Sequence, residues 1–115
     1  MVGGRVIGAI ERTAPSGDWR TNVSRGGSVQ PFELPPEWVQ LALRATVAVG
    51  ADYAGVDLLP SRAGRVFVLE VNGIPGWKGL QQATGVDVAG AIVDHLVERV
   101  RRGEAAAAYP AGLPT

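Results

Sequence analysis

The chain has 115 residues, no cysteine, and equal numbers of acidic and basic side chains, so its formal net charge is zero. This length suits one small domain with a hydrophobic core, and the neutral charge excludes the electrostatic footprint of a nucleic-acid or anionic-membrane binder. The lack of cysteine excludes disulfides and thiolate metal sites, and no long apolar run is present, so we expect a soluble, cytoplasmic protein with no membrane partner.

The N-terminal segment predicts a hairpin followed by a strand. Gly3 and Gly4 stand where a tight turn is expected, and the strand is predicted over residues 5–12. Its partner would have to lie before Met1, which would leave an open strand edge. Residues 13–19 form a polar loop that contains proline and glycine, the composition of loops that carry function.

The next segment carries polar side chains at alternating positions. Arg20 and Asn22 share a face if the backbone is extended, and a guanidinium matches phosphate or carboxylate. On charge alone, Arg20 and Arg25 are expected to be solvated surface residues. Gly26 and Gly27 would let the backbone approach a ligand closely, and a short strand is predicted over residues 28–32.

A helix is predicted to begin at Leu34-Pro35-Pro36-Glu37 and to stop at Gly50. Proline suits the first helical turn, and an acidic residue there faces the positive end of the helix dipole. The apolar residues recur at helical spacing and predict one buried face: Trp38, Leu41, Ala42, Ala45 and Val49.

Two short apolar strands are predicted next, over residues 53–59 and 66–72, joined by the turn at residues 61–64. Strand alternation would turn Phe67, Leu69 and Val71 toward a core. Val68, Glu70 and Asn72 would then point to the opposite side. Two oxygen-bearing side chains therefore leave one face of the second strand, two residues apart.

The position of Asp57 relative to this pair depends on the hairpin register. If paired residue numbers sum to 125 or 127, Asp57 shares the face of Glu70 and Asn72, whereas a sum of 126 places it on the other face. Asp, Glu and Asn together supply hard oxygen ligands of the kind that Mg²⁺ takes. Taken alone, an Asp and an Asn at strand ends are more often turn-formers or solvated edge residues.

The C-terminal third predicts a loop leading to a short helical turn over residues 77–84, then a helix capped by Asp87. Val88, Ile92, Leu96 and Val100 would form the buried stripe of this helix, with Gly103 as its C-terminal cap. We expect His95 to be a surface or packing residue. Lys78 is placed in solvent, with a contact to an incoming carboxylate as the alternative, and residues 103–115 are expected to form a disordered tail.

Four motifs follow one another along the chain: the run from Gly17 to Gly27, then Ala54-Gly55-Val56-Asp57, then Glu70-Val71-Asn72-Gly73-Ile74-Pro75-Gly76, and then Thr84-Gly85-Val86-Asp87-Val88-Ala89. Together, and in this order, they resemble the C-terminal part of the ATP-grasp domain of RimK-like ligases. The resemblance covers residues 2 to about 100. It implies an α+β fold, an antiparallel β-sheet with helices packed on it, over residues 1–102.

The resemblance also implies roles for individual residues. Arg20, Thr21 and Asn22 fall on the family's ATP-contacting triplet, and Arg25 falls beside the transferring phosphate or the substrate carboxylate as a catalytic residue. Asp57, Glu70 and Asn72 match the ligands of Mg²⁺ or Mn²⁺, with two ions expected.

The function implied is that of an ATP-dependent carboxylate–amine ligase. A carboxylate acceptor would be activated as an acyl phosphate and attacked by an amino acid, for which glutamate is expected, although Trp77 and Lys78 depart from the glutamate-ligase pattern. The family's phosphate-binding lysines lie in a preceding half, and the only lysine here is Lys78. The alternatives are a catalytically inactive module that binds metal or nucleotide weakly, and an interaction module or homo-oligomer formed through an open strand edge.

Overall fold

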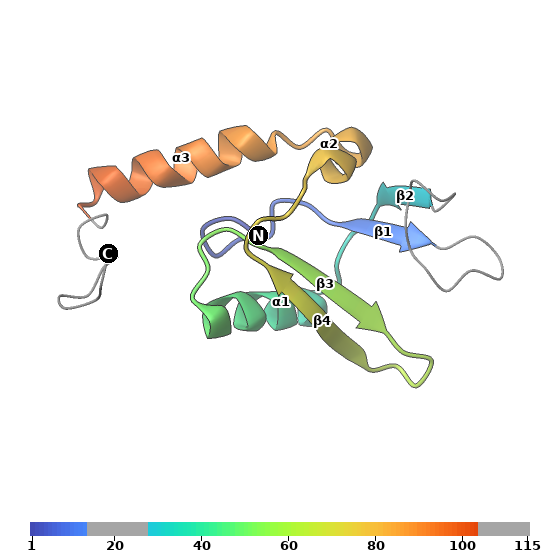
Figure 1. Cartoon of the computed structure of the whole chain (residues 1–115). Coiled ribbons are helices and arrows are strands. Elements are labelled where there is room, and N and C mark those ends of the chain that lie inside the picture. Colours follow the sequence, from blue (N-terminus) through green and yellow to red (C-terminus); the bar gives the residue numbers. More distant parts are fainter. Residues whose placement is uncertain (14–27, 104–115) are drawn as a thin grey trace.

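The computed structural model describes residues 1–13 and 28–103. Within these ranges the chain forms two antiparallel strand pairs and three helices (Figure 1). In chain order the elements are β1 (Ile10–Thr13), β2 (Ser28–Pro31), α1 (Pro36–Val49), β3 (Gly55–Pro60), β4 (Val66–Asn72), α2 (Lys78–Thr84) and α3 (Val88–Arg101). The predicted α+β class with antiparallel strands is confirmed.

The N-terminal turn at residues 2–5 is joined to the segment that leads into β3. Gly3 and Gly4 have φ values of 57° and 75°, and Val2 bridges Arg5 across this turn, as predicted. Val2 also bridges Tyr53, and the Ala54 amide donates to the Met1 carbonyl oxygen over 3.1 Å. Val2 and Ala54 are almost fully buried as a result, so this junction is part of the small core.

The predicted first strand is shorter than expected. Regular pairing begins only at Ile10, where β1 meets β2 in an antiparallel ladder, and the Phe32 amide donates to the Ala9 carbonyl oxygen over 3.1 Å. Residues 6–9 run up to β1 outside the regular ladder, and strand propensity without a paired neighbour does not make a strand.

Helix α1 has the ends that its sequence predicts. Pro36 opens the helix, and Gly50 closes it in the left-handed conformation at φ 72°, which a residue without a side chain adopts readily. Ala42 and Thr46 are buried, whereas Val49 is exposed, contrary to the predicted stripe. The buried residues lie four positions apart, and the next residue in that series would be Gly50, where the helix ends.

Helix α1 contacts one face of the β3–β4 hairpin, as Figure 1 shows. The turn between the strands lies where predicted, because the Ser61 amide donates to the Arg65 carbonyl oxygen and Gly64 takes a φ of 82°. Leu58, Val66 and Val68 are partly buried on the side toward α1.

The prediction that Phe67 and Leu69 face the core is wrong. Phe67 is 47% exposed and Leu69 is 62% exposed. The cause is a shift of register, because Asp57 pairs with Glu70 while Leu58 pairs with Val68, which leaves Leu69 as an extra residue in β4. Such a β-bulge interrupts the alternation of side chains along the strand that carries it.

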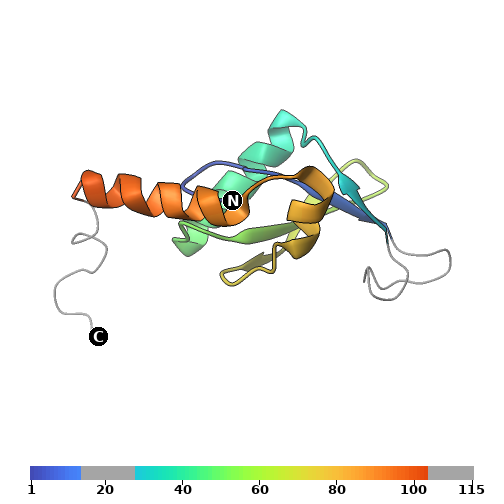
Figure 2. The same ribbon diagram turned by 90° about the horizontal axis from the view of Figure 1, so that it is seen from above.

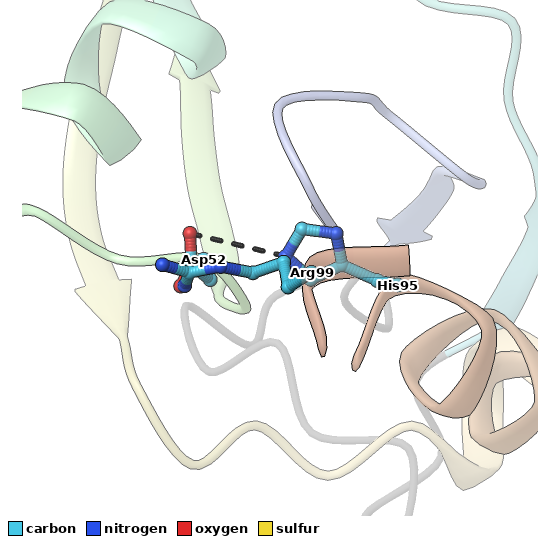
Figure 3. Close-up of polar contacts among 3 residues, drawn as sticks. All are labelled: Asp52, His95 and Arg99. Carbon is cyan, nitrogen blue, oxygen red and sulfur yellow. Dashed lines mark hydrogen bonds and ion pairs between the residues drawn. The ribbon is translucent and has the colours of Figure 1, made fainter. Parts of the chain in front are cut away.

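Helix α3 is fixed to the N-terminal junction by Asp52 (Figure 3). Arg99 forms an ion pair with the Asp52 carboxylate, and His95 Nε2 lies 3.9 Å from the same carboxylate. A Cβ added to Gly3 would lie 2.5 Å from His95 Nδ1, so the imidazole packs directly on the glycine. The expectation that His95 is a surface or packing residue is confirmed as a packing role.

The buried residues of α3 differ from the predicted stripe. Val88 is buried and Ile92 is partly buried, but Leu96 and Val100 are exposed, because beyond the first turns the body contacts the side of α3 that carries His95 and Arg99.

In the described residues no helix is both long and apolar enough to cross a membrane.

The cap of α3 provides a stability test. The Asp87 carboxylate accepts a hydrogen bond from the Gly90 amide over 3.0 Å. Replacing Asp87 with Ala is expected to lower the free energy of unfolding by about 1 kcal/mol, whereas Asp87→Ser keeps an oxygen acceptor and should cost a few tenths at most. Equal losses for both variants in urea denaturation would contradict the capping role.

Candidate metal centre

The candidate centre lies on the face of the β3–β4 hairpin turned away from α1. Asp57 pairs with Glu70 and Gly55 pairs with Asn72, so the paired residue numbers sum to 127. This is one of the two registers predicted to bring the three side chains onto one face. Asp57, Glu70 and Asn72 are all exposed there, on two strands that hold them in a fixed order.

The two carboxylates stand directly opposite each other. Opposed residues on antiparallel strands have Cβ atoms about 4.5–5.5 Å apart, and like charges in this position destabilise the pairing. None of the ion pairs formed within residues 1–13 and 28–103 involves Asp57 or Glu70. A cation bound between the two carboxylates would offset this repulsion, because it attracts both of them.

Asn72 has a structural role besides its predicted one. Its Oδ1 accepts a hydrogen bond from the Ile74 amide over 2.9 Å, which stabilises the turn after β4. An amide oxygen has two lone pairs, so one remains available for a cation. The turn-forming and metal-ligating interpretations of Asn72 are therefore compatible.

The loop after β4 folds back onto the start of β3. The Tyr53 hydroxyl donates to the Pro75 carbonyl oxygen over 3.1 Å, and the Tyr53 and Trp77 rings meet edge to face with centroids 6.1 Å apart. Desolvation by its surroundings raises the pKa of the Tyr53 hydroxyl, which keeps this donor protonated. A Cβ on Gly55 would lie only 2.8 Å from the Pro75 Cβ, so the loop packs against Gly55.

Two apolar side chains share the face of the carboxylates, and the sequence prediction missed both. Leu59 alternates with Asp57 along β3, and its partner Phe67 lies next to it on β4. They are 49% and 47% exposed. The available signal was the spacing of Leu59 from Asp57, which puts them on the same face of the strand.

Other parts of the described structure offer no comparable donor set. Within residues 1–13 and 28–103, no three or more His, Cys, Asp or Glu side chains are grouped to hold a metal, so the candidate centre depends on the Asn72 amide as well as its two carboxylates. A cavity of about 540 Å³ lies elsewhere, beside α1. Its lining consists of residues 4–9 with Phe32, Leu34, Val39 and Leu43.

The structure does not describe the other residues predicted to form the site. Arg20, Thr21, Asn22 and Arg25 lie outside the described residues, as does the predicted tail from residue 104. Lys78 begins α2 and is exposed, in agreement with the expected solvated position.

Comparison with known proteins adds family information to this geometry. Residues 1–96 match the family model described as the RimK-like ATP-grasp domain. A probable alpha-L-glutamate ligase 2 of Hahella chejuensis is 46% identical over 103 residues, which cover 90% of this chain and 34% of that protein. A probable alpha-L-glutamate ligase of Parasynechococcus marenigrum is 45% identical over 87% of this chain and 21% of its own length. The chain thus spans about a third or less of these relatives.

Solved structures share the fold. The ATP-grasp ligase PsnB, complexed with its minimal precursor, Mg and ADP, superimposes with a TM-score of 0.70 at 24% identity, over 88% of this chain and 30% of that one. The PsnB complex with precursor peptide PsnA2 and AMPPNP gives a TM-score of 0.69 over the same share of each chain. The described elements therefore form part of an ATP-grasp fold.

Proposed function

Because the chain belongs to the RimK-like ATP-grasp family, we propose that it is the part of an ATP-dependent carboxylate–amine ligase that holds the phosphates of ATP through Mg²⁺. The observation that carries this proposal is the exposed Asp57–Glu70 pair with Asn72 beside it. Two carboxylates held opposite each other cost stability unless a cation binds them.

The donor set fits magnesium. Mg²⁺ prefers oxygen ligands, keeps several waters, and is commonly held by one or two carboxylates together with substrate phosphates. Asp57 and Glu70 would supply the carboxylates and Asn72 an amide oxygen, while the open face leaves room for water and phosphate. Mn²⁺ accepts the same ligands. Two ions fit the proposal if Glu70 binds both.

The apolar pair beside the carboxylates supports a nucleotide in particular. Leu59 and Phe67 lie next to Asp57 and Glu70 on the same exposed face. With Mg²⁺ held by the carboxylates, a ligand that has a flat ring and an anionic part can use both halves of this surface, and ATP has both parts. A free phosphate would use only the metal.

The chemistry expected of the whole ligase is transfer of the γ-phosphoryl group to a carboxylate, followed by attack of an amine on the acyl phosphate. Bound metal would neutralise charge that develops on the transferring group. The protein's own part is positioning and electrostatic stabilisation. We propose that Arg20, Thr21 and Asn22 contact ATP and that Arg25 donates to the transferring group or the substrate carboxylate.

Glutamate is the proposed amino acid, supported by the names of the relatives, which are probable alpha-L-glutamate ligases. Because the chain spans only about a third or less of their length, recognition of the carboxylate acceptor is proposed to involve residues that it does not contain.

A chimeric enzyme tests this proposal. Residues 1–103 would replace the matching third of the Hahella chejuensis relative, and phosphate release from ATP would be measured with glutamate and a panel of carboxylate acceptors. We expect turnover that needs Mg²⁺. In the same chimera Glu70→Gln should lower the rate by more than the roughly 10- to 100-fold typical of losing an outer-shell partner of a metal.

Two results would oppose the proposal in different ways. A folded chimera that binds Mg-ATP without amino-acid-dependent turnover would contradict the ligase assignment. An active chimera that tolerates Glu70→Gln would contradict the metal centre.

A further inference from the structure

Helix α3 carries a solvent-exposed apolar stripe. Val93, Leu96, Val97 and Val100 are between 41% and 59% exposed. They recur at i, i+3, i+4 and i+7, so they lie side by side along one face of the helix. Most exposed apolar residues of a surface stand singly, whereas a row of four on one helix indicates a contact surface.

The opposite face of α3 accounts for its contacts with the body. Val88 is buried, His95 packs on Gly3, and Arg99 pairs with Asp52. From its end beside α2 the helix extends away from the strands, as the views in Figures 1 and 2 show. The stripe is therefore not turned toward the body.

The charges beside the stripe suggest what covers it. Asp94 and Arg101 are both exposed and lie seven residues apart, so they stand on the same flank, one toward each end. In a parallel pair the flank of Asp94 and Arg101 would face the opposite flank of the second helix, so these two residues would not meet their counterparts. In an antiparallel pair the two equal flanks face each other, so Asp94 of each helix would lie near Arg101 of the other.

We propose that the stripe pairs with the same stripe of a second copy of this chain, antiparallel and across a twofold axis. The axis would pass at the level of Val97, near the middle of the stripe and midway between Asp94 and Arg101, and each pair of opposite charges would occur twice, as an isologous interface requires. This proposal is independent of the proposed ligase activity.

The interface is expected to be weak. A helix of 14 residues is about 21 Å long, and one stripe on it covers far less than the roughly 800 Å² per partner of a standard stable interface. Dimerisation should therefore depend on concentration over the micromolar to millimolar range.

Sedimentation of the 115-residue chain from about 10 μM to about 1 mM tests the proposal. The mass should rise from 12.0 kDa toward twice that value. Leu96→Asp should remain monomeric throughout, and Val100→Lys provides an independent disruption at the end of the stripe. Val47→Asp is the matched control, because Val47 is an equally apolar residue exposed on α1, outside the stripe.

Charge variants test the orientation. Asp94→Arg alone should weaken dimerisation about 3- to 10-fold, and adding Arg101→Asp should restore it, as expected for exposed ion pairs. A strict monomer at every concentration would overturn the proposal. The stripe would then be expected to pack against another part of a longer ligase. A dimer that resists both Leu96→Asp and Val100→Lys would also overturn it.

Discussion

Replacing Glu70 with Gln is expected to abolish Mg²⁺-dependent binding of ATP and at the same time to make the metal-free chain more stable. Glu70 stands opposite Asp57 on an exposed sheet face, and no ion pair within the described residues relieves the repulsion. Removing one charge should raise the free energy of unfolding by about 0.2–1 kcal/mol. Calorimetric titration measures the first effect, and urea denaturation in EDTA measures the second.

The opposite signs of the two effects make this prediction specific. A substitution that merely damaged the fold would lower both stability and binding. Asp57→Asn should repeat the pattern of Glu70→Gln, and Glu33→Gln, at an exposed position outside the hairpin, should change neither quantity. Unchanged binding in Glu70→Gln, or lower stability in EDTA, would contradict the role of the carboxylate pair.

Replacing Gly55 with Ala is expected to destabilise the chain by about 1–3 kcal/mol, the range for forcing extra atoms into a packed contact. The new Cβ would lie 2.8 Å from the Pro75 Cβ, closer than two carbon atoms approach without displacement. The shift would also move the turn that Asn72 stabilises, because Gly55 is the partner of Asn72. Binding of Mg-ATP should therefore fall together with the melting temperature.

Gly76→Ala is the matched control for this substitution. A Cβ at Gly76 has nothing within 4 Å, and its backbone lies outside the left-handed region. We expect its stability to stay close to that of the wild type. A Gly55→Ala chain as stable as Gly76→Ala would show that the loop does not pack on β3 as described.

Features that depend on a few neighbouring residues were predictable from the sequence. Pro36 and Gly50 bound α1, Asp87 caps α3, and Gly3-Gly4 and Gly64 form turns, as their local chemistry requires. The register that unites Asp57 with Glu70 and Asn72 was only one of the possibilities, because a sum of 125 or 127 would put them on one face and a sum of 126 would not. Strong local signals fix where each helix, strand and turn begins and ends along the chain.

The bulge at Leu69 could not be predicted in the same way. An extra residue in one strand is a property of a strand pair, and the apolar run Val66 to Leu69 alternates equally well without it. The prediction therefore turned Phe67 toward the core. In the structure Phe67 lies on the carboxylate face, where it contributes the apolar part of the candidate site.

The packing of α3 could not be predicted either. Its periodicity is that of an amphipathic helix, but which apolar residues are covered depends on where Asp52 and Gly3 meet it. Those contacts join segments distant in sequence. The apolar pattern predicted a buried stripe, without indicating that Leu96 and Val100 are exposed in the described fold.

The most direct test of the metal centre is to locate the cation by nuclear magnetic resonance. Mn²⁺ accepts the ligands of Mg²⁺ and broadens the signals of nearby amides, so it would be added in small amounts to the labelled chain in the presence of ATP. We predict selective loss of the amide signals of residues 55–59 and 67–72, with those of α3 unaffected, and no such pattern in Glu70→Gln. Broadening that spares Asp57 and Glu70, or that centres on another part of the chain, would contradict the account.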